Sequence, residues 1–134
     1  MVQSIRVLLI DDEPAQCETL ADILDEHGCV VHPCSDPRRG AALGRGQRFD
    51  LVLLDLKMGG IDGVELLRRI RPQTHGCIVV LTGMAEASVK RAAVAEGADA
   101  VMEKPVDIPR LLEIAQDVRS TGDCKRSAAL VPVP

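Results

Sequence analysis

Five polar residues follow the aliphatic runs of this chain, and their side-chain types suit phosphoryl transfer. They comprise three carboxylates, one hydroxyl and one ammonium, and they are Asp11, Asp12, Asp55, Thr82 and Lys104. Three carboxylates held close together repel one another, so such a cluster requires a cation. Because the ligand atoms on offer are oxygens, we expect a hard ion, Mg²⁺ or Mn²⁺, rather than zinc.

The chemistry that this set could perform is the acceptance of a phosphoryl group by a carboxylate. Mg²⁺ held by few carboxylates keeps coordination positions for water and for phosphate oxygens. The Lys104 ammonium is a point charge of the kind that pairs with phosphate, and the Thr82 hydroxyl can donate a hydrogen bond to a phosphoryl oxygen. The combination is typical of a phosphoryl-transfer site with an aspartate nucleophile.

Each of these residues has a structural explanation when it is taken alone. Asp11 and Asp12 could cap a helix, and Asp55 could occupy a turn. Thr82 could be an ordinary strand residue, and Lys104 a solvated surface lysine. We prefer the functional interpretation because all of these explanations would otherwise have to hold together at corresponding strand ends.

The segments between the polar residues predict an α/β fold. Short aliphatic runs predict five buried strands, at residues 5–10, 29–32, 49–55, 77–82 and 100–102. Amphipathic segments predict five helices, at residues 15–27, 37–44, 64–70, 86–96 and 108–119. We expect Pro33 to end the second strand and residues 57–62 to form a glycine-rich loop.

Five β-then-α units in a row predict an open doubly wound five-stranded parallel sheet with helices on both faces. In such sheets the ligand crevice lies beyond the carboxyl ends of the strands, which is where the five polar residues fall. We expect residues 1–120 to form this domain and residues 121–134 to form a flexible tail.

Composition and charge narrow the class of protein further. The 134 residues are 46% apolar, which suits one compact core. Phe49 is the only aromatic residue and the formal net charge is −4, so the composition argues against direct nucleic-acid binding. Without a signal segment or an apolar stretch of membrane-spanning length, the sequence predicts a cytoplasmic protein that makes no membrane contact.

The order and spacing of these residues resemble the receiver domain of two-component response regulators. The resemblance covers residues 5 to about 119, and it rests on the segments VLLIDDEP (7–14), FDLVLLDLKMGGIDGVELLRRI (49–70), VVLTG (79–83) and GADAVMEKP (97–105). It implies a flavodoxin-like fold with strand order 2-1-3-4-5. It also implies a signalling switch that assists its own phosphorylation and dephosphorylation but is not a turnover enzyme.

By this resemblance, Asp55 would accept a phosphoryl group from a histidine kinase or a histidine phosphotransfer protein. Thr82 and Lys104 would hold the phosphoryl oxygens. The surface formed by residues 86–103 would then change its binding to an output protein, which the sequence does not identify. Because no output domain follows, we expect a stand-alone receiver; the alternative is that the proline-containing tail is the stub of a linker from a longer protein.

The resemblance also implies a set of metal ligands. Asp12, Asp55 and the backbone carbonyl of Lys57 would bind Mg²⁺ directly, and Asp11 would act mainly through water. Three further residues would lie near the site: Gly83, Met84 and Pro105. Met84 and Lys57 would border the path of the attacking water. The bond from Lys104 to Pro105 is cis in many relatives.

Two departures from the family pattern leave alternatives open. Val101 stands where relatives usually have Tyr or Phe, which weakly favours a degenerate receiver that acts only as a docking module. The complete set of five site residues argues against that alternative. Gly59 and Gly60 add backbone freedom, so we expect a more mobile loop.

A haloacid-dehalogenase-like phosphatase is a second alternative function. Such an enzyme would have an Asp at the position of Lys57 to act as acid and base. A lysine ammonium, with a pKa of about 10.4, shuttles protons poorly at neutral pH.

Overall fold

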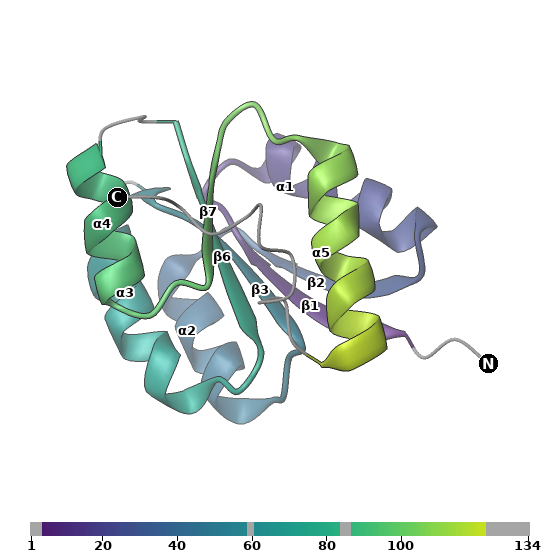
Figure 1. Ribbon diagram of the computed structural model, residues 1–134. Helices are drawn as coiled ribbons and strands as arrows, with labels where there is room; N and C mark the ends of the chain where they lie inside the picture. Colours follow the sequence, from purple (N-terminus) through teal and green to yellow (C-terminus); the bar gives the residue numbers. More distant parts are fainter. Residues whose placement is uncertain (1–3, 59–60, 84–86, 123–134) are drawn as a thin grey trace.

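A central parallel sheet with helices on both faces organises the chain (Figure 1). This computed structural model describes residues 4–58, 61–83 and 87–122. The strands of the sheet are β1 Ile5–Ile10, β2 Cys29–Cys34, β3 Leu51–Asp55, β6 Cys77–Thr82 and β7 Ala100–Glu103. They lie in the order β2-β1-β3-β6-β7, all in parallel pairs, so the predicted 2-1-3-4-5 sheet is confirmed.

Five helices alternate with these strands. They are α1 Pro14–Glu26, α2 Pro37–Gly46, α3 Gly63–Ile70, α4 Ala87–Ala95 and α5 Ile108–Thr121, and a 3₁₀ turn, η1, follows α3 at Arg71–Gln73. Asp107 caps α5 by accepting a hydrogen bond from the Arg110 amide at 3.2 Å. Gly28 follows α1 with a φ of 85°, a conformation that favours glycine.

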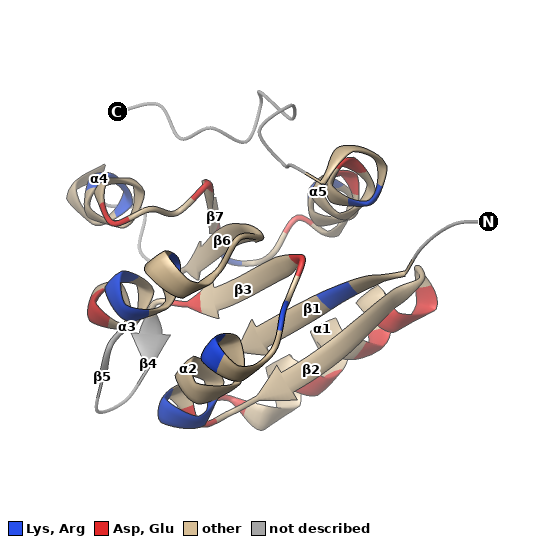
Figure 2. Ribbon diagram, turned by 90° about the horizontal axis from the view of Figure 1, so that it is seen from below, with Lys and Arg blue, Asp and Glu red and all other residues tan. Residues whose placement is uncertain are grey.

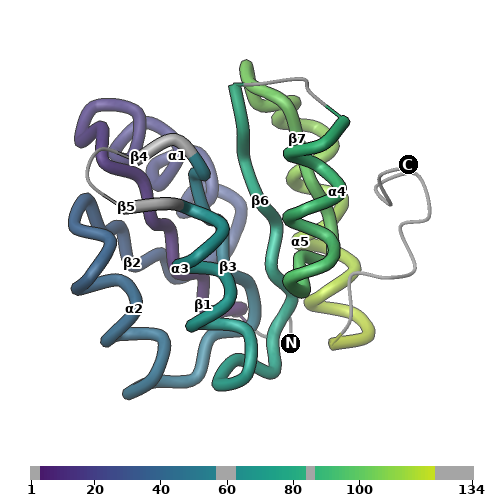
Figure 3. Tube along the Cα trace, turned by 90° about the vertical axis from the view of Figure 1, so that its left-hand side faces the viewer, coloured from purple at the N-terminus to yellow at the C-terminus, as the bar shows by residue number. Residues whose placement is uncertain are grey.

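The helices divide into two layers, which explains the continuous aliphatic runs of the strands. Helices α1 and α5 cover one face of the sheet, and α2, α3 and α4 lie side by side across the other, the face shown in Figure 3. Leu9 and Leu53 belong to the core beneath α1 and α5, while Leu8 and Val52 belong to the core beneath α2, α3 and α4. Successive strand residues point to opposite faces, so both faces must be apolar.

The structure corrects two local predictions. Strand β2 continues through Pro33 to Cys34, because β2 is an edge strand and a proline there forfeits no ladder hydrogen bond on its unpaired side. Residues 57–62 do not form a simple loop, since β4 (Lys57–Met58) and β5 (Ile61–Asp62) pair as a short antiparallel ribbon. Gly59 and Gly60, for which a mobile loop is expected, lie outside the described residues. Within the described part of the chain, no helix has both the length and the apolar character needed to cross a membrane.

The half-buried Arg71 side chain ties the segment before β6 to the segment between α4 and β7. Its guanidinium donates to the carbonyl oxygens of Gly97 at 3.1 Å, Thr74 at 2.6 Å and Gly76 at 2.9 Å. It also pairs with the Asp99 carboxylate at 2.9 Å.

We expect Arg71→Met to lower the free energy of unfolding by about 2–4 kcal/mol, because it leaves Asp99 without its cation and three carbonyls without a donor. Urea denaturation monitored by circular dichroism measures this loss. Arg69→Met is the matched control: Arg69 makes only an exposed pair with Glu65, so its loss should be within about 0.5 kcal/mol. Equal losses in the two variants would contradict the role given to Arg71.

Candidate functional site

Two buried carboxylates lie side by side where adjacent strands end. Ile10 and Leu54 are register partners in the parallel pair β1–β3, and Asp11 and Asp55 are the residues that follow them. Asp11 is 3% exposed and Asp55 is 2% exposed. Strand alignment therefore places both carboxylates at the carboxyl edge of the sheet, although 44 positions separate them in the sequence.

Asp12 completes an acidic cluster with these two residues. One carboxylate oxygen from each of Asp11, Asp12 and Asp55 can be chosen so that all three lie within 4.8 Å of one another. Opposite ligands of an octahedral Mg²⁺ ion are about 4.2 Å apart, given bonds of about 2.1 Å. The three carboxylates therefore fit a small hard cation after modest side-chain adjustment, and their all-oxygen donor set matches Mg²⁺ or Mn²⁺.

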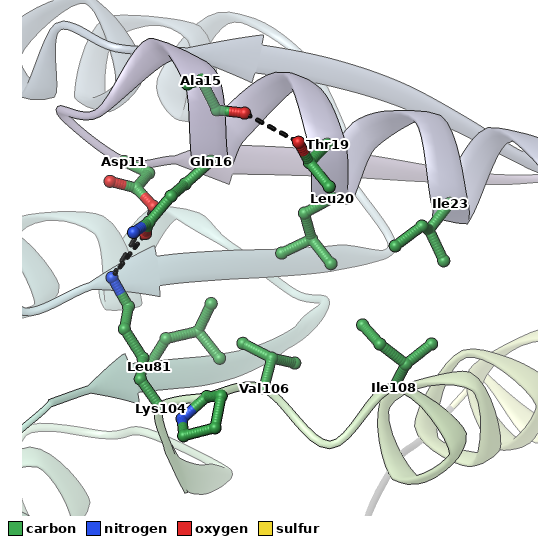
Figure 4. Close-up of a pocket in the computed structure, with 11 residues that line it drawn as sticks. Asp11, Ala15, Gln16, Thr19, Leu20, Ile23, Leu81, Lys104, Val106 and Ile108 are labelled. Atoms are coloured by element: carbon green, nitrogen blue, oxygen red, sulfur yellow. Dashed lines mark hydrogen bonds and ion pairs between the residues drawn. The ribbon is translucent and has the colours of Figure 1, made fainter.

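Lys104 brings a positive charge to the same cluster from the end of β7. Its Nζ atom lies 2.8 Å from Asp55 Oδ2 and 3.8 Å from Asp11 Oδ2. The ammonium also donates to Gln16 Oε1 at 3.3 Å, a contact visible in Figure 4. The peptide bond from Lys104 to Pro105 is cis. The ammonium thus lies where it can neutralise part of the carboxylate charge.

The pKa of Asp11 and the pKa of Lys104 are both raised within the cluster. Burial raises the pKa of Asp11, and the nearby charge of Asp55 adds to the rise, against the opposing effects of the Glu13 amide and Lys104. Burial lowers the pKa of Lys104, but the hydrogen bond and charge of Asp55 and the charges of Asp11 and Glu13 outweigh it, so the pKa is raised. A divalent cation would relieve the repulsion that Asp11 experiences.

We expect Asp11→Asn to raise the melting temperature of the metal-free chain at pH 7 by roughly 2–5 °C. The folded-state pKa of Asp11 is raised, so its contribution to stability is fully present below the unfolded pKa and is lost as pH rises through the folded pKa. The melting temperature of the variant should therefore rise relative to that of the parent as pH increases from about 4 to 7, in a thermal melt followed by circular dichroism. Asp22→Asn, on the exposed face of α1, is the control. A lower melting temperature for Asp11→Asn at pH 7 without metal would contradict this reading.

The other predicted site residues lie at or beside the same edge. Thr82 is 1% exposed at the end of β6, one residue beyond Leu81, which is the register partner of Asp55. Gly83 follows it and is exposed, and a side chain built there would meet no atom within 4 Å. Lys57 begins β4, two residues after Asp55. Met84 lies outside the described residues.

Sequence reasoning did not identify Gln16 or the groove that extends from it. Gln16 lies in the first turn of α1, directly after the Asp11–Asp12 pair, and that placement is the one signal that could have identified it. A groove of about 490 Å³ runs from Asp11, Gln16 and Lys104 along the space between α1 and the start of α5. Figure 4 shows its apolar walls, which are formed by Leu20, Ile23, Leu81, Val106 and Ile108.

Comparison with known proteins gives one consistent family. The family model of the response regulator receiver domain matches residues 7–116. The transcriptional regulatory protein TcrA of Mycobacterium tuberculosis is 31% identical over 130 residues, which cover 96% of this chain and 51% of TcrA. The chain spans about half the length of TcrA and of other curated relatives that it matches.

Two solved structures share the fold. A CheY-like receiver domain protein from Methanospirillum hungatei has a TM-score of 0.81 and 28% identity, covering 90% of this chain and 97% of that one. A response regulator from Burkholderia pseudomallei has a TM-score of 0.79 and 26% identity, covering 98% and 78%. The second structure carries a phosphorylated aspartic acid, a calcium ion and citrate.

Proposed function

We propose, since this chain belongs to the response regulator receiver domain family, that it is a signalling switch whose Asp55 accepts a phosphoryl group from a phosphohistidine. The observation that carries the proposal is the meeting of Asp55 with Lys104 and the Asp11–Asp12 pair at one buried edge. The phosphorylated aspartic acid and the cation in the Burkholderia relative support it. We place the switch in the cytoplasm, as a receiver of residues 1–120.

Asp55 and Lys104 would perform the transfer together. A carboxylate oxygen of Asp55 attacks phosphorus in line, the P–N bond to the donor imidazole breaks, and the product is an aspartyl phosphate. Lys104 would move from Asp55 Oδ2 to the phosphoryl oxygens, and Thr82 would donate a hydrogen bond to them. Mg²⁺, held by Asp12, Asp55 and the Lys57 carbonyl, with Asp11 acting through water, would neutralise charge on the transferring group.

The contacts of Thr82 support an output through the α4–β7 surface (residues 87–103), the described part of the predicted 86–103 surface. The Lys104 amide donates to the Thr82 carbonyl at 2.8 Å, and Thr82 pairs in register with Glu103. The Glu103 carboxylate in turn pairs with Lys90 on α4. A shift of Thr82 toward a phosphoryl group can therefore reach α4 through Glu103, although Val101 carries no ring at the usual switch position.

The groove beside Lys104 supports a protein as the phosphoryl donor. It ends at the reacting pocket, and its half-buried and apolar walls suit the apolar stripe of a partner helix (Figure 4). A donor histidine on such a helix would lie next to Lys104 and Asp55. We therefore propose that a histidine kinase or a histidine phosphotransfer protein docks in this groove.

Ile23→Glu should slow transfer from a phosphorylated histidine kinase by at least about tenfold, because a charge in an apolar interface costs more than about 1.4 kcal/mol. Phosphorylation by acetyl phosphate, which needs no docking, should be unchanged. Rates are measured from phosphoprotein gels with a kinase that phosphorylates the parent chain. Val94→Glu, at an exposed apolar position on α4, is the control. Equal slowing with both donors would show that Ile23 does not serve docking.

Intact-mass spectrometry after incubation with acetyl phosphate tests the proposed function as a whole. We expect a gain of one phosphoryl group per chain with Mg²⁺ and none with EDTA. No gain under either condition would favour the docking module. Repeated hydrolysis of a small phosphate ester at useful rates would favour the phosphatase.

A further inference from the structure

A second cavity lies at the opposite end of the sheet, below the amino ends of β3 and β6. It measures about 260 Å³ and is formed by two chain segments, residues 44–49 after α2 and residues 73–75 after η1. These segments lie together at the lower edge of Figure 1. The phosphoacceptor edge lies at the other end of β3, so the cavity plays no part in the chemistry described above.

The titratable side chains that line this cavity are all basic or neutral. They are Arg45, Arg48 and His75, and among the described residues no acidic side chain lines the cavity. The segment from α2 to β3 is basic as a whole, since residues 37–49 hold four arginines and no acidic residue. Figure 2 shows this concentration of basic residues at α2, whereas α1 is acidic. A basic cavity in a chain of net charge −4 indicates an anionic ligand.

Two partly buried arginines, Arg6 and Arg71, hold the two walls of the cavity in place. The Arg6 guanidinium donates to the Arg48 carbonyl at 3.0 Å, pairs with the Gln47 side chain, and lies 5.0 Å from the centre of the Phe49 ring. On the other side, Arg71 donates to the Thr74 carbonyl. These contacts fix the backbone of both segments, so a ligand would meet a largely preformed site.

The Thr74 hydroxyl provides an independent sign of a missing partner. Thr74 lines the cavity and is 8% exposed, and its Oγ1 atom has no hydrogen-bond partner within the described part of the chain. A buried hydroxyl without a hydrogen-bond partner is unfavourable. The cavity wall therefore contains a buried polar group whose hydrogen-bonding capacity is not used by the described residues.

Interaction with the dipole of α2 explains only one of the two arginines that line the cavity. Arg45 lies in the last turn of α2, where a cation offsets the negative helix end. Arg48 lies beyond the end of α2 at Gly46, and it takes part in none of the ion pairs between described residues. Guanidinium groups offer forked donors that match the oxygens of a phosphate group.

We propose that this cavity, between residues 44–49 and 73–75, binds the phosphate group of a small molecule. Two guanidinium groups, the His75 ring and the backbone amides of the two segments would surround the anion. The site would give the switch a second input, separate from phosphorylation of Asp55.

Nuclear magnetic resonance titration of the full chain, without Mg²⁺, tests the proposal with inorganic phosphate and pyrophosphate as probes. The backbone amide signals of residues 44–49 and 73–75 should shift saturably. Arg48→Gln should weaken the affinity by at least about tenfold, and a second variant, Arg45→Gln, should weaken it in the same direction. Arg39→Gln, an exposed arginine of α2 outside the cavity, should change it by less than about twofold.

Three results would overturn the proposal. Shifts that stay linear in phosphate concentration would show only nonspecific screening. Equal losses for Arg48→Gln and Arg39→Gln would show a diffuse basic surface rather than a site. Saturable binding of citrate with no binding of either phosphate probe would show that the cavity takes carboxylates instead.

Discussion

Asp55→Asn should abolish the phosphoryl gain from acetyl phosphate and Mg²⁺, leaving less than about 1% of the parent's extent of phosphorylation. The substitution replaces the attacking carboxylate oxygen with a neutral amide of the same shape, and a neutral amide is a far weaker nucleophile. Intact-mass spectrometry measures the result. The fold should persist, because an asparagine oxygen can still accept the hydrogen bond from Lys104 that Asp55 Oδ2 now accepts at 2.8 Å.

Asp50→Asn is the matched control for this substitution. Asp50 immediately precedes β3 at the opposite end from Asp55, and its carboxylate accepts a hydrogen bond from the Arg6 amide at 2.8 Å. The Asp50→Asn variant should be phosphorylated to the same extent as the parent. A full phosphoryl gain in Asp55→Asn would mean that another residue is the acceptor.

Lys104→Met should move two measurements in opposite directions. Phosphorylation by acetyl phosphate should slow by about 10²-fold, because a charged donor to the transition-state oxygens is lost. The affinity for Mg²⁺ should rise several-fold, because the ammonium that competes for Asp55 Oδ2 and repels the cation is removed. A time course of intact-mass spectrometry measures the phosphorylation rate, and isothermal titration calorimetry measures the affinity for Mg²⁺.

Lys90→Met separates this local effect from a change in net charge. It removes the same charge from the α4–β7 surface, where Lys90 pairs with Glu103 outside the acidic cluster. Its Mg²⁺ affinity should stay within about twofold of the parent value. A fall in Mg²⁺ affinity for Lys104→Met would contradict the electrostatic account of the pocket.

Much of the fold follows from local patterns in the sequence. The aliphatic runs at residues 5–10 and 77–82 have the bounds of β1 and β6, because a strand buried on both faces leaves an uninterrupted apolar signal. The parallel sheet aligns strand ends, so it could also be predicted that Asp11, Asp55 and Lys104 would meet.

The remaining features depend on tertiary contacts that no local pattern specifies. The contact between Gln16 and Lys104 joins residues 88 positions apart and depends on how α1 packs against the sheet. Pro33 was expected to end β2, and only the edge position of that strand shows why it does not. The role of Arg71 could not be predicted either. Its acceptors Thr74 and Gly97 lie before and after β6 in the sequence, and they come together only when the sheet forms.

Tandem mass spectrometry after incubation with acetyl phosphate and Mg²⁺ identifies the residue that accepts the phosphoryl group. Borohydride reduction turns an aspartyl phosphate into homoserine, which marks the acceptor in the peptide. If Asp55 is the acceptor, homoserine should be found at position 55 alone. Homoserine at Asp11 or Asp12, or a phosphoryl group on any other side chain, would contradict it.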